Sequence, residues 1–197
     1  MLQIDEMDPS QSINDLFQPL YQRASNIYTF VALRNQADEI SRDYGTGELS
    51  NMTEAHLVID ICDHEGATVT ELAEMSCRTK SAISQIIAKI EKKGYITRKR
   101  CKSNYRVYHF YPTEEGLRLC RQHKIYDVQM MLATNERLLK FCTQEEIDAF
   151  YKVLHYRCID LKERLDTDRK ASMEKEKAAK WRDCPTSRTP IQQNPRE

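Results

Sequence analysis

The sequence predicts a mainly helical protein with a small β wing: a winged helix-turn-helix core with N- and C-terminal dimerisation helices. Three observations lead to this class. Glycine and proline are scarce, five and six among 197 residues, so turns are few and helices are favoured. Apolar residues recur every three or four positions over most of the chain. Residues 95–111 instead are typical of a β hairpin: an extended start at Tyr95 and Ile96, a polar and basic tip over 98–104, and an alternating, aromatic-rich returning strand from Tyr105 to Tyr111.

The N-terminal half is expected to hold one long helix, over residues 13–43, followed by three shorter ones. Gly45 and Gly47 end the long helix, and Thr53 is the expected N-cap of the next. The third short helix covers about residues 80–93, with Thr79 as N-cap and an apolar stripe on one side. That stripe consists of Ile83, Ile86, Ile87 and Ile90. A very short turn separates the last two helices, which is typical of a helix-turn-helix.

Two further helices are expected after the hairpin. Thr113 is the N-cap of the first, and Thr143 with Glu146 forms a capping box for the second. The second carries apolar residues at spacings close to a coiled-coil seam. The expected organisation is a flexible N-terminus (1–12), an N-terminal dimerisation helix (13–48), a winged helix-turn-helix DNA-binding domain (49–112), C-terminal dimerisation helices (113–165) and a charged, mostly disordered tail (166–197). A helical extension into this tail, towards Trp181, is left open.

Charge is distributed unevenly, although the whole chain carries 30 basic and 30 acidic residues. Residues 76–106 contain ten Lys or Arg and a single acid, Glu91, so this stretch has a net charge of +9 and the remainder −9. A basic stretch on an otherwise acidic chain is typical of a protein that binds the phosphate backbone of nucleic acid. An ordinary solvated charged face is the plainer alternative.

The second helix of a helix-turn-helix presents its first turns to base edges in the major groove. The expected base-reading residues are Lys80, Ser81, Ser84 and Gln85. Among them Gln pairs with adenine through two hydrogen bonds, and Ser is a less selective partner. Cations of the turn and the wing, together with a neighbouring hydroxyl, are expected to hold phosphates. This second set consists of Arg78, Thr79, Arg98, Arg100, Lys102 and Arg106.

These segments together resemble the MarR family of bacterial regulators. The resemblance covers residues 52 to about 119 and rests on Met52-Thr-Glu-Ala-His56, Leu72-Ala-Glu74, Thr79, Ile83-Ser84, Glu91-Lys-Lys-Gly-Tyr-Ile-Thr-Arg98 and Thr113-Glu-Glu-Gly116. Four positions depart from the family pattern. His56 stands where Gln is common, and Asn104 stands where the wing usually carries an Asp two residues before an Arg. Ser76 and Cys77 stand where an apolar residue and a Gly are common in the turn.

The resemblance implies a homodimer that binds double-stranded DNA. Two recognition helices would then meet a pseudo-palindromic operator, one helical turn apart, and repression is favoured over activation. The sequence leaves two rivals open: an interaction module whose basic face binds an acidic protein, and a redox- or metal-responsive form of the regulator. The resemblance also leaves a small-molecule effector open, bound between the dimer helices and the DNA-binding domain. Tyr21, Tyr28, His56 and Cys62 could line such a cleft or could equally be packing residues.

Several other classes of function are not favoured. No nucleophile elbow, phosphate-binding glycine loop or zinc-protease motif is present, so we expect neither an enzyme nor a bound cofactor. Seven scattered cysteines form no CxxC pair, and we expect no metal site. Cys77 and Cys101 lie among basic residues, where an oxidation switch is the alternative to incidental thiols. The absence of a leader segment or a long apolar run predicts a cytoplasmic protein without a membrane partner.

Overall fold

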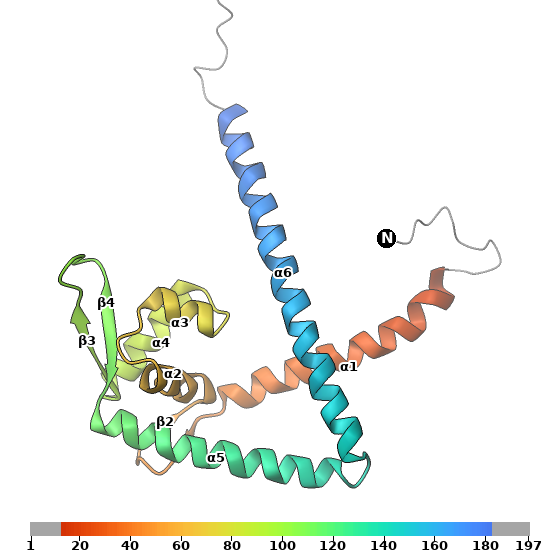
Figure 1. Cartoon of the computed structure of the whole chain (residues 1–197), viewed down its shortest axis with the longest axis horizontal. Coiled ribbons are helices and arrows are strands. Elements are labelled where there is room, and N and C mark those ends of the chain that lie inside the picture. Colours follow the sequence, from red (N-terminus) through yellow and green to blue (C-terminus); the bar gives the residue numbers. More distant parts are fainter. Residues whose placement is uncertain (1–12, 183–197) are drawn as a thin grey trace, which may run out of the picture. The chain divides into compact units, whose positions relative to one another are not determined.

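The computed structural model describes residues 13–182. It confirms a mainly helical chain with a two-stranded wing (Figure 1). The elements are α1 (Ile13–Glu39), β1 (Arg42–Asp43), β2 (Leu49–Ser50), α2 (Met52–Asp63), α3 (Val69–Met75), α4 (Lys80–Lys92), β3 (Ile96–Arg100), β4 (Tyr108–Pro112), α5 (Glu114–Leu138) and α6 (Gln144–Arg182). The chain divides into two compact units between Met131 and Leu132. The expected flexible segment 1–12 lies outside the described residues.

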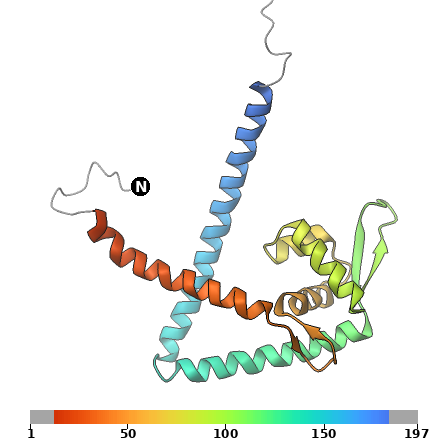
Figure 2. The ribbon, with the colours of Figure 1, turned by 180° about the vertical axis from the view of Figure 1, so that it is seen from behind.

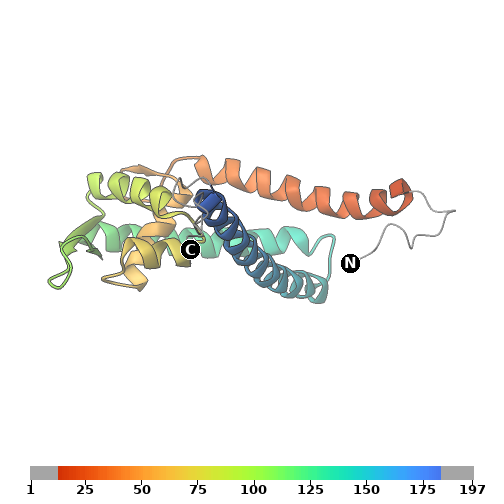
Figure 3. The ribbon, with the colours of Figure 1, turned by 90° about the horizontal axis from the view of Figure 1, so that it is seen from above.

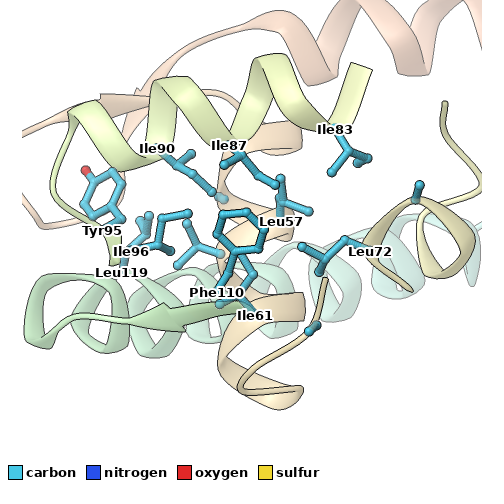
Figure 4. Close-up of a cluster of buried hydrophobic side chains, with 14 of the residues drawn as sticks. Leu57, Ile61, Leu72, Ile83, Ile87, Ile90, Tyr95, Ile96, Phe110 and Leu119 are labelled. Carbon is cyan, nitrogen blue, oxygen red and sulfur yellow. The ribbon is translucent and has the colours of Figure 1, made fainter. Parts of the chain in front are cut away.

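The core of the first unit forms where α2, α3 and α4 meet the wing. Ile83, Ile87 and Ile90 project from one side of α4 and are at most 4% exposed. They point toward Leu57 and Ile61 of α2, and toward other apolar side chains of α3 and β4 (Figure 4). Each such burial contributes about 1.5–3 kcal/mol. This packing decides which side of α4 faces solvent.

Helix caps set the boundaries of the short helices. Thr79 caps α4 as predicted, because its hydroxyl accepts a hydrogen bond from the backbone N–H of Ala82 at 3.2 Å. The prediction for α2 was wrong by two residues. Asn51, rather than Thr53, is the N-cap, and its side chain accepts from the N–H of Glu54 at 2.9 Å. Both residue types cap well, so the residue pattern alone could not choose between them.

A small hairpin that the sequence did not predict separates α1 from α2 (Figure 2). α1 ends at Glu39, four residues before the expected end, and β1 pairs antiparallel with β2 through Arg42–Ser50 and Asp43–Leu49. The carboxylate of Asp43 accepts from the N–H groups of Gly45, Thr46 and Gly47 at 2.8–3.0 Å. Strands of two residues are too short to show an alternating pattern, which is why only the glycines signalled the turn.

α5 docks on the end of α4 through a close backbone contact. Thr113 donates its hydroxyl to the carbonyl of Gly94 at 2.6 Å and accepts from the N–H of Gly116 at 3.1 Å. A Cβ added at Gly116 would lie 2.0 Å from the carbonyl oxygen of Tyr95. The Thr113–Gly116 motif therefore combines a helix cap with a position where only glycine fits.

α6 is one continuous helix to Arg182 (Figure 3), which agrees with the helical extension towards Trp181 that the sequence left open. The capping box that starts it is present, with Thr143 N–H donating to Glu146 at 2.8 Å. Residues 166–182 are rich in Lys, Ala, Glu and Arg, which are strong helix formers, and contain no proline. The mostly disordered tail was expected to begin at residue 166, and residues 166–182 belong instead to this helix. Residues 183–197 lie outside the described part of the chain.

Replacing Gly116 with Ala should lower the free energy of unfolding by about 2–3 kcal/mol, because the methyl group would overlap the Tyr95 carbonyl. In an unobstructed helix the same change would instead stabilise the protein by about 1 kcal/mol. Urea denaturation monitored by circular dichroism measures the difference, with the exposed neighbour Glu115→Ala as control. Equal stability of Gly116→Ala and wild type would contradict the close contact.

Candidate nucleic-acid interface

The exposed side of α4 carries the four residues predicted to read bases. Lys80, Ser81, Ser84 and Gln85 all lie in its first two turns and are exposed. The buried isoleucines hold the opposite side against the core, so these four polar side chains share one outward surface. The structure thus brings the predicted set together; that it contacts DNA stays a prediction.

The hydroxyl groups on this surface already have partners within the chain. Ser84 donates to the carbonyl of Lys80 at 2.8 Å, and Ser81 lies 3.1 Å from the hydroxyl of Thr79. In this arrangement Ser84 offers lone pairs rather than a proton to an incoming base edge. The side-chain amide of Gln85 has no hydrogen-bond partner among the described residues, so both its N–H donors and its oxygen acceptor are available to a base. Gln85 is therefore the best-suited base reader of the four.

The wing holds two of its arginines around a tyrosine. β3 pairs antiparallel with β4, and Arg100 lies opposite Tyr108. The Nε of Arg100 donates to the Tyr108 hydroxyl at 2.9 Å, and the guanidinium of Arg98 lies 4.9 Å from the centre of the same ring. Arg98 also forms an ion pair with Glu91 at 3.2 Å. Tyr108 and Glu91 orient these cations, a role that sequence reasoning had not assigned to either residue.

The remaining predicted cations lie in loops. Lys102 and Arg106 are exposed in the segment that connects β3 to β4, which is longer than expected because β4 begins at Tyr108 rather than Tyr105. Asn104 holds residues 105–107 in a turn instead of a strand. Its side-chain oxygen accepts a hydrogen bond from the N–H of Arg106 at 3.1 Å, and its backbone carbonyl accepts one from the N–H of Val107 at 2.9 Å. Arg78 is exposed in the turn and donates to the hydroxyl of Thr53 at 3.4 Å.

A largely buried ion pair anchors the end of α4, and it too was missed from sequence. Lys93 Nζ lies 2.6 Å from Glu54 Oε2 and also donates to the carbonyl of Leu49 at 2.6 Å. The Glu54 side chain is only 9% exposed. Lys93 was counted among the basic residues of the segment, yet it faces inward. The pair joins the recognition helix to the start of α2.

Lys93→Met should reduce the free energy of unfolding by about 3 kcal/mol, since it leaves the Glu54 carboxylate buried without a counter-charge. The neighbouring exposed Lys92→Met serves as a matched control and should change stability far less. Combining Lys93→Met with Glu54→Met should recover most of the loss, because no charge then remains buried. Thermal or urea unfolding of wild type, Lys93→Met, Lys92→Met and the double variant measures these differences. If Lys93→Met were as stable as Lys92→Met, the ion pair would not be stabilising.

Residues 50–108, from just before α2 into the wing, match the MarR family. The winged helix-turn-helix predicted from the sequence is also the fold of solved structures that this chain resembles.

Individual relatives extend the match. An uncharacterized HTH-type transcriptional regulator of Bacillus subtilis, YhjH, is 29% identical over 118 residues, which are 58% of this chain and 65% of that protein. The match thus spans less than two thirds of the relative. FabT of Streptococcus pneumoniae, solved in complex with DNA, superposes with a TM-score of 0.53 at 21% identity, covering 75% of this chain and 98% of that one. ZitR of Lactococcus lactis, a zinc-responsive MarR family member, has a TM-score of 0.52 at 22% identity, covering 72% and 98%. Below 25% identity these likenesses concern the fold.

Two of the departures from the MarR pattern, Cys77 and Asn104, have structural consequences. Cys77 has a φ of 52° in the turn between α3 and α4, a left-handed conformation that glycine adopts without strain. The chain therefore keeps the backbone that the family's usual glycine favours and accepts a cost of about 1–2 kcal/mol. Asn104 hydrogen-bonds to the backbone rather than the side chain of Arg106. Asn104 therefore does not hold the Arg106 guanidinium in place.

A half-exposed thiol lies at the base of the wing loop. The Cys101 sulfur is 3.1 Å from the hydroxyl of Ser103, and this hydroxyl, with the imidazole of His109, lowers the pKa of the thiol to about 6. His109 is itself held by the carbonyl of Gly66 at 2.6 Å. Cys101 is thus largely thiolate at neutral pH. The expectation that it is an incidental thiol stays untested.

Alkylation of Cys101 by iodoacetamide should accelerate as pH rises through about 6 and then level off, because the thiolate is the reacting form. Ser103→Ala removes the main stabilising hydrogen bond and should move the midpoint to higher pH, whereas Ser84→Ala should not. Peptide mass spectrometry over a pH series measures the rate at this cysteine alone. A midpoint unchanged by Ser103→Ala would refute the assigned cause.

Among residues 13–182, no helix combines the length and the apolar character needed to cross a membrane.

Proposed function

We propose that this chain is a sequence-specific DNA-binding transcriptional regulator that binds a pseudo-palindromic operator as a homodimer, with repression as its effect. The observation that carries the proposal is the joint exposure of the α4 polar surface and the basic wing. α4 and the wing are neighbouring elements of the same unit (Figure 1). α4 carries the four exposed polar residues, and the wing carries four of the exposed cations expected to hold phosphates. Such a pair suits base reading in the major groove together with phosphate binding beside it.

Charge supports a nucleic-acid partner over an acidic protein. The stretch from Ser76 to Arg106 carries +9 in a chain that is neutral overall. Arg98 and Arg100 are held in place by Tyr108, which reduces the side-chain entropy that binding would cost. FabT of Streptococcus pneumoniae, which shares this fold, was solved in complex with DNA, and this supports the proposal.

Exposed apolar side chains on the flanking helices support a dimer. On α1, Leu20, Tyr28 and Phe30 are 62–69% exposed, and α5 and α6 carry similar residues, among them Met131 at 69% and Tyr156 at 62%. Apolar surface of this extent on helices outside the core calls for a partner to cover it. A second copy of the same chain is the partner that would also supply a second recognition helix, at the spacing of a palindrome.

Selection of bound fragments from a genomic duplex pool at physiological salt tests the proposal. Wild type should enrich one palindrome, bound by two chains and favoured over random DNA by about 4 kcal/mol or more. Gln85→Ala should relax preference at defined bases by about 1–3 kcal/mol while leaving the salt dependence unchanged. Arg100→Ala should weaken binding to all sequences and lower the slope of log K against log salt by about 1.

Gln129→Ala, an exposed glutamine of α5, is the matched control for Gln85→Ala and should leave the selected sequence unaltered. Equal binding to all duplexes that disappears as salt rises would overturn the regulator proposal. That result, combined with capture of an acidic protein by the wing, would instead favour the interaction module.

A further inference from the structure

The tip of the wing is a closed turn that holds two side chains outward. The N–H of Val107 donates to the carbonyl of Asn104 at 2.9 Å, and the N–H of Arg106 donates to the Asn104 side chain at 3.1 Å. Nearer the strands, the N–H of Cys101 donates to the carbonyl of Val107 at 2.9 Å. Tyr105 and Arg106 therefore occupy the two corner positions of a four-residue turn. The wing ends in an aromatic ring beside a cation.

Tyr105 differs from its neighbours Tyr108 and Tyr111. Each of those two rings carries a basic side chain, with the cation 4.4–5.5 Å from the ring centre. The Tyr105 side chain is 73% exposed, and neither its ring nor its hydroxyl has a partner among the described residues. Single exposed aromatic residues are common on proteins, but this one is fixed by a turn and lies between the exposed cations Lys102 and Arg106. An aromatic residue in a basic loop suits a nucleic-acid partner, because its cations bind phosphates while its ring contacts sugars or bases.

The place of the turn in the fold indicates which part of a duplex it would meet. The wing extends beside α4, and the turn lies at the end of the wing that points away from α5 (Figure 1). When a helix occupies the major groove, a neighbouring arm of the same protein can reach the adjacent minor groove. With α4 in the major groove, Tyr105 and Arg106 would face the minor groove that flanks the half-site.

We propose that Tyr105 is a further specificity-determining residue, which enters the minor groove beside each half-site and selects A·T pairs there. The minor groove is about 6 Å wide, so a ring fits between its walls only edge-on. An A·T pair presents only acceptors in this groove, to which the Tyr105 hydroxyl can donate. A G·C pair adds the amino group of guanine, which fills the floor of the groove and offers a donor in place of an acceptor. This inference rests on the proposed function and adds a second place where the operator is read.

The cations of the loop do not account for this selection in the same way. Lys102 neutralises phosphate whichever base pairs lie nearby. Arg106 favours a narrow minor groove through its charge, so its contribution follows the width of the groove and not one amino group. A change that adds only the guanine-type amino group to an A·T pair therefore tests the ring and its hydroxyl.

The probe is the palindromic duplex that wild type selects from the genomic pool, and its flanks should contain A·T pairs. Replacing adenine by diaminopurine adds the minor-groove amino group and leaves the A·T pairing in place. At the position that Tyr105 contacts, this change should weaken wild-type binding roughly 5- to 150-fold, the range for one wrong base pair. An inosine·C pair keeps the A·T pattern in the minor groove and should be tolerated at the same position.

Tyr105→Ala should bind the A·T and diaminopurine duplexes equally. The side chain is exposed and without contacts, so the variant should fold, as circular dichroism would verify. Lys102→Ala and Arg106→Ala are matched controls from the same loop: each should weaken binding to both duplexes and keep the difference between them. Gln85→Ala should also keep it, because α4 does not reach the minor groove.

The outcomes separate this inference from the regulator proposal. If wild type selects a palindrome but tolerates the added amino group at every flanking position, the role of Tyr105 is overturned and the regulator stands. Discrimination that survives in Tyr105→Ala, or that disappears in Arg106→Ala instead, overturns it as well. If wild type prefers no duplex at all, both proposals fail.

Discussion

The burial of three isoleucines on α4 is the interaction on which the rest of the structure depends. Ile83, Ile87 and Ile90 pack against α2, α3 and β4, and their burial determines the rotation of the helix about its axis. Every polar residue of the proposed base-reading surface faces outward as a consequence. A helix turned by one residue would bury Ser84 and expose Ile83, at a cost of several kcal/mol. Core packing therefore determines which side chains of α4 form the proposed binding surface.

Two contacts of different kinds then place the neighbours of α4. At its C-terminal end, the Lys93–Glu54 pair and the Tyr95–Gly116 contact tie α2 and α5 to the same turn. The wing follows directly from Tyr95, so its direction is set by the same junction (Figure 1). Recognition helix, wing and α5 thus share one rigid anchor. This arrangement also holds His56 of α2 opposite His123 and Asp127 of α5.

The charges of the basic segment serve different purposes, despite their similarity in sequence. Lys93 is the buried counter-ion of Glu54. Arg98 contacts both the Glu91 carboxylate and the Tyr108 ring, whereas Lys102 is exposed at the wing tip. A net charge of +9 consequently overstates the number of cations available to phosphates. The positioned arginines lose less entropy on binding than the loop cations do.

Much of the architecture follows from the sequence alone. The 3.6-residue periodicity, the threonine caps at Thr79 and Thr113 and the change to alternation after Gly94 predict the order and type of the main elements. The exposed set on α4 follows from the isoleucine stripe, because a helix has only one opposite side. For residues 166–182 the sequence left a helical extension and a disordered tail both open, since charged helix formers suit either, and the structure has the helix.

Tertiary structure alone decided the features that depend on residues distant in sequence. Glu54 and Lys93 are 39 positions apart, and no local pattern links them. His56 likewise contacts His123 and Asp127, which follow it by more than 60 residues. The close approach at Gly116 likewise depends on where Tyr95 lies. Local propensity determines which elements form, but contacts between elements, and the sites built on them, arise only when the chain packs.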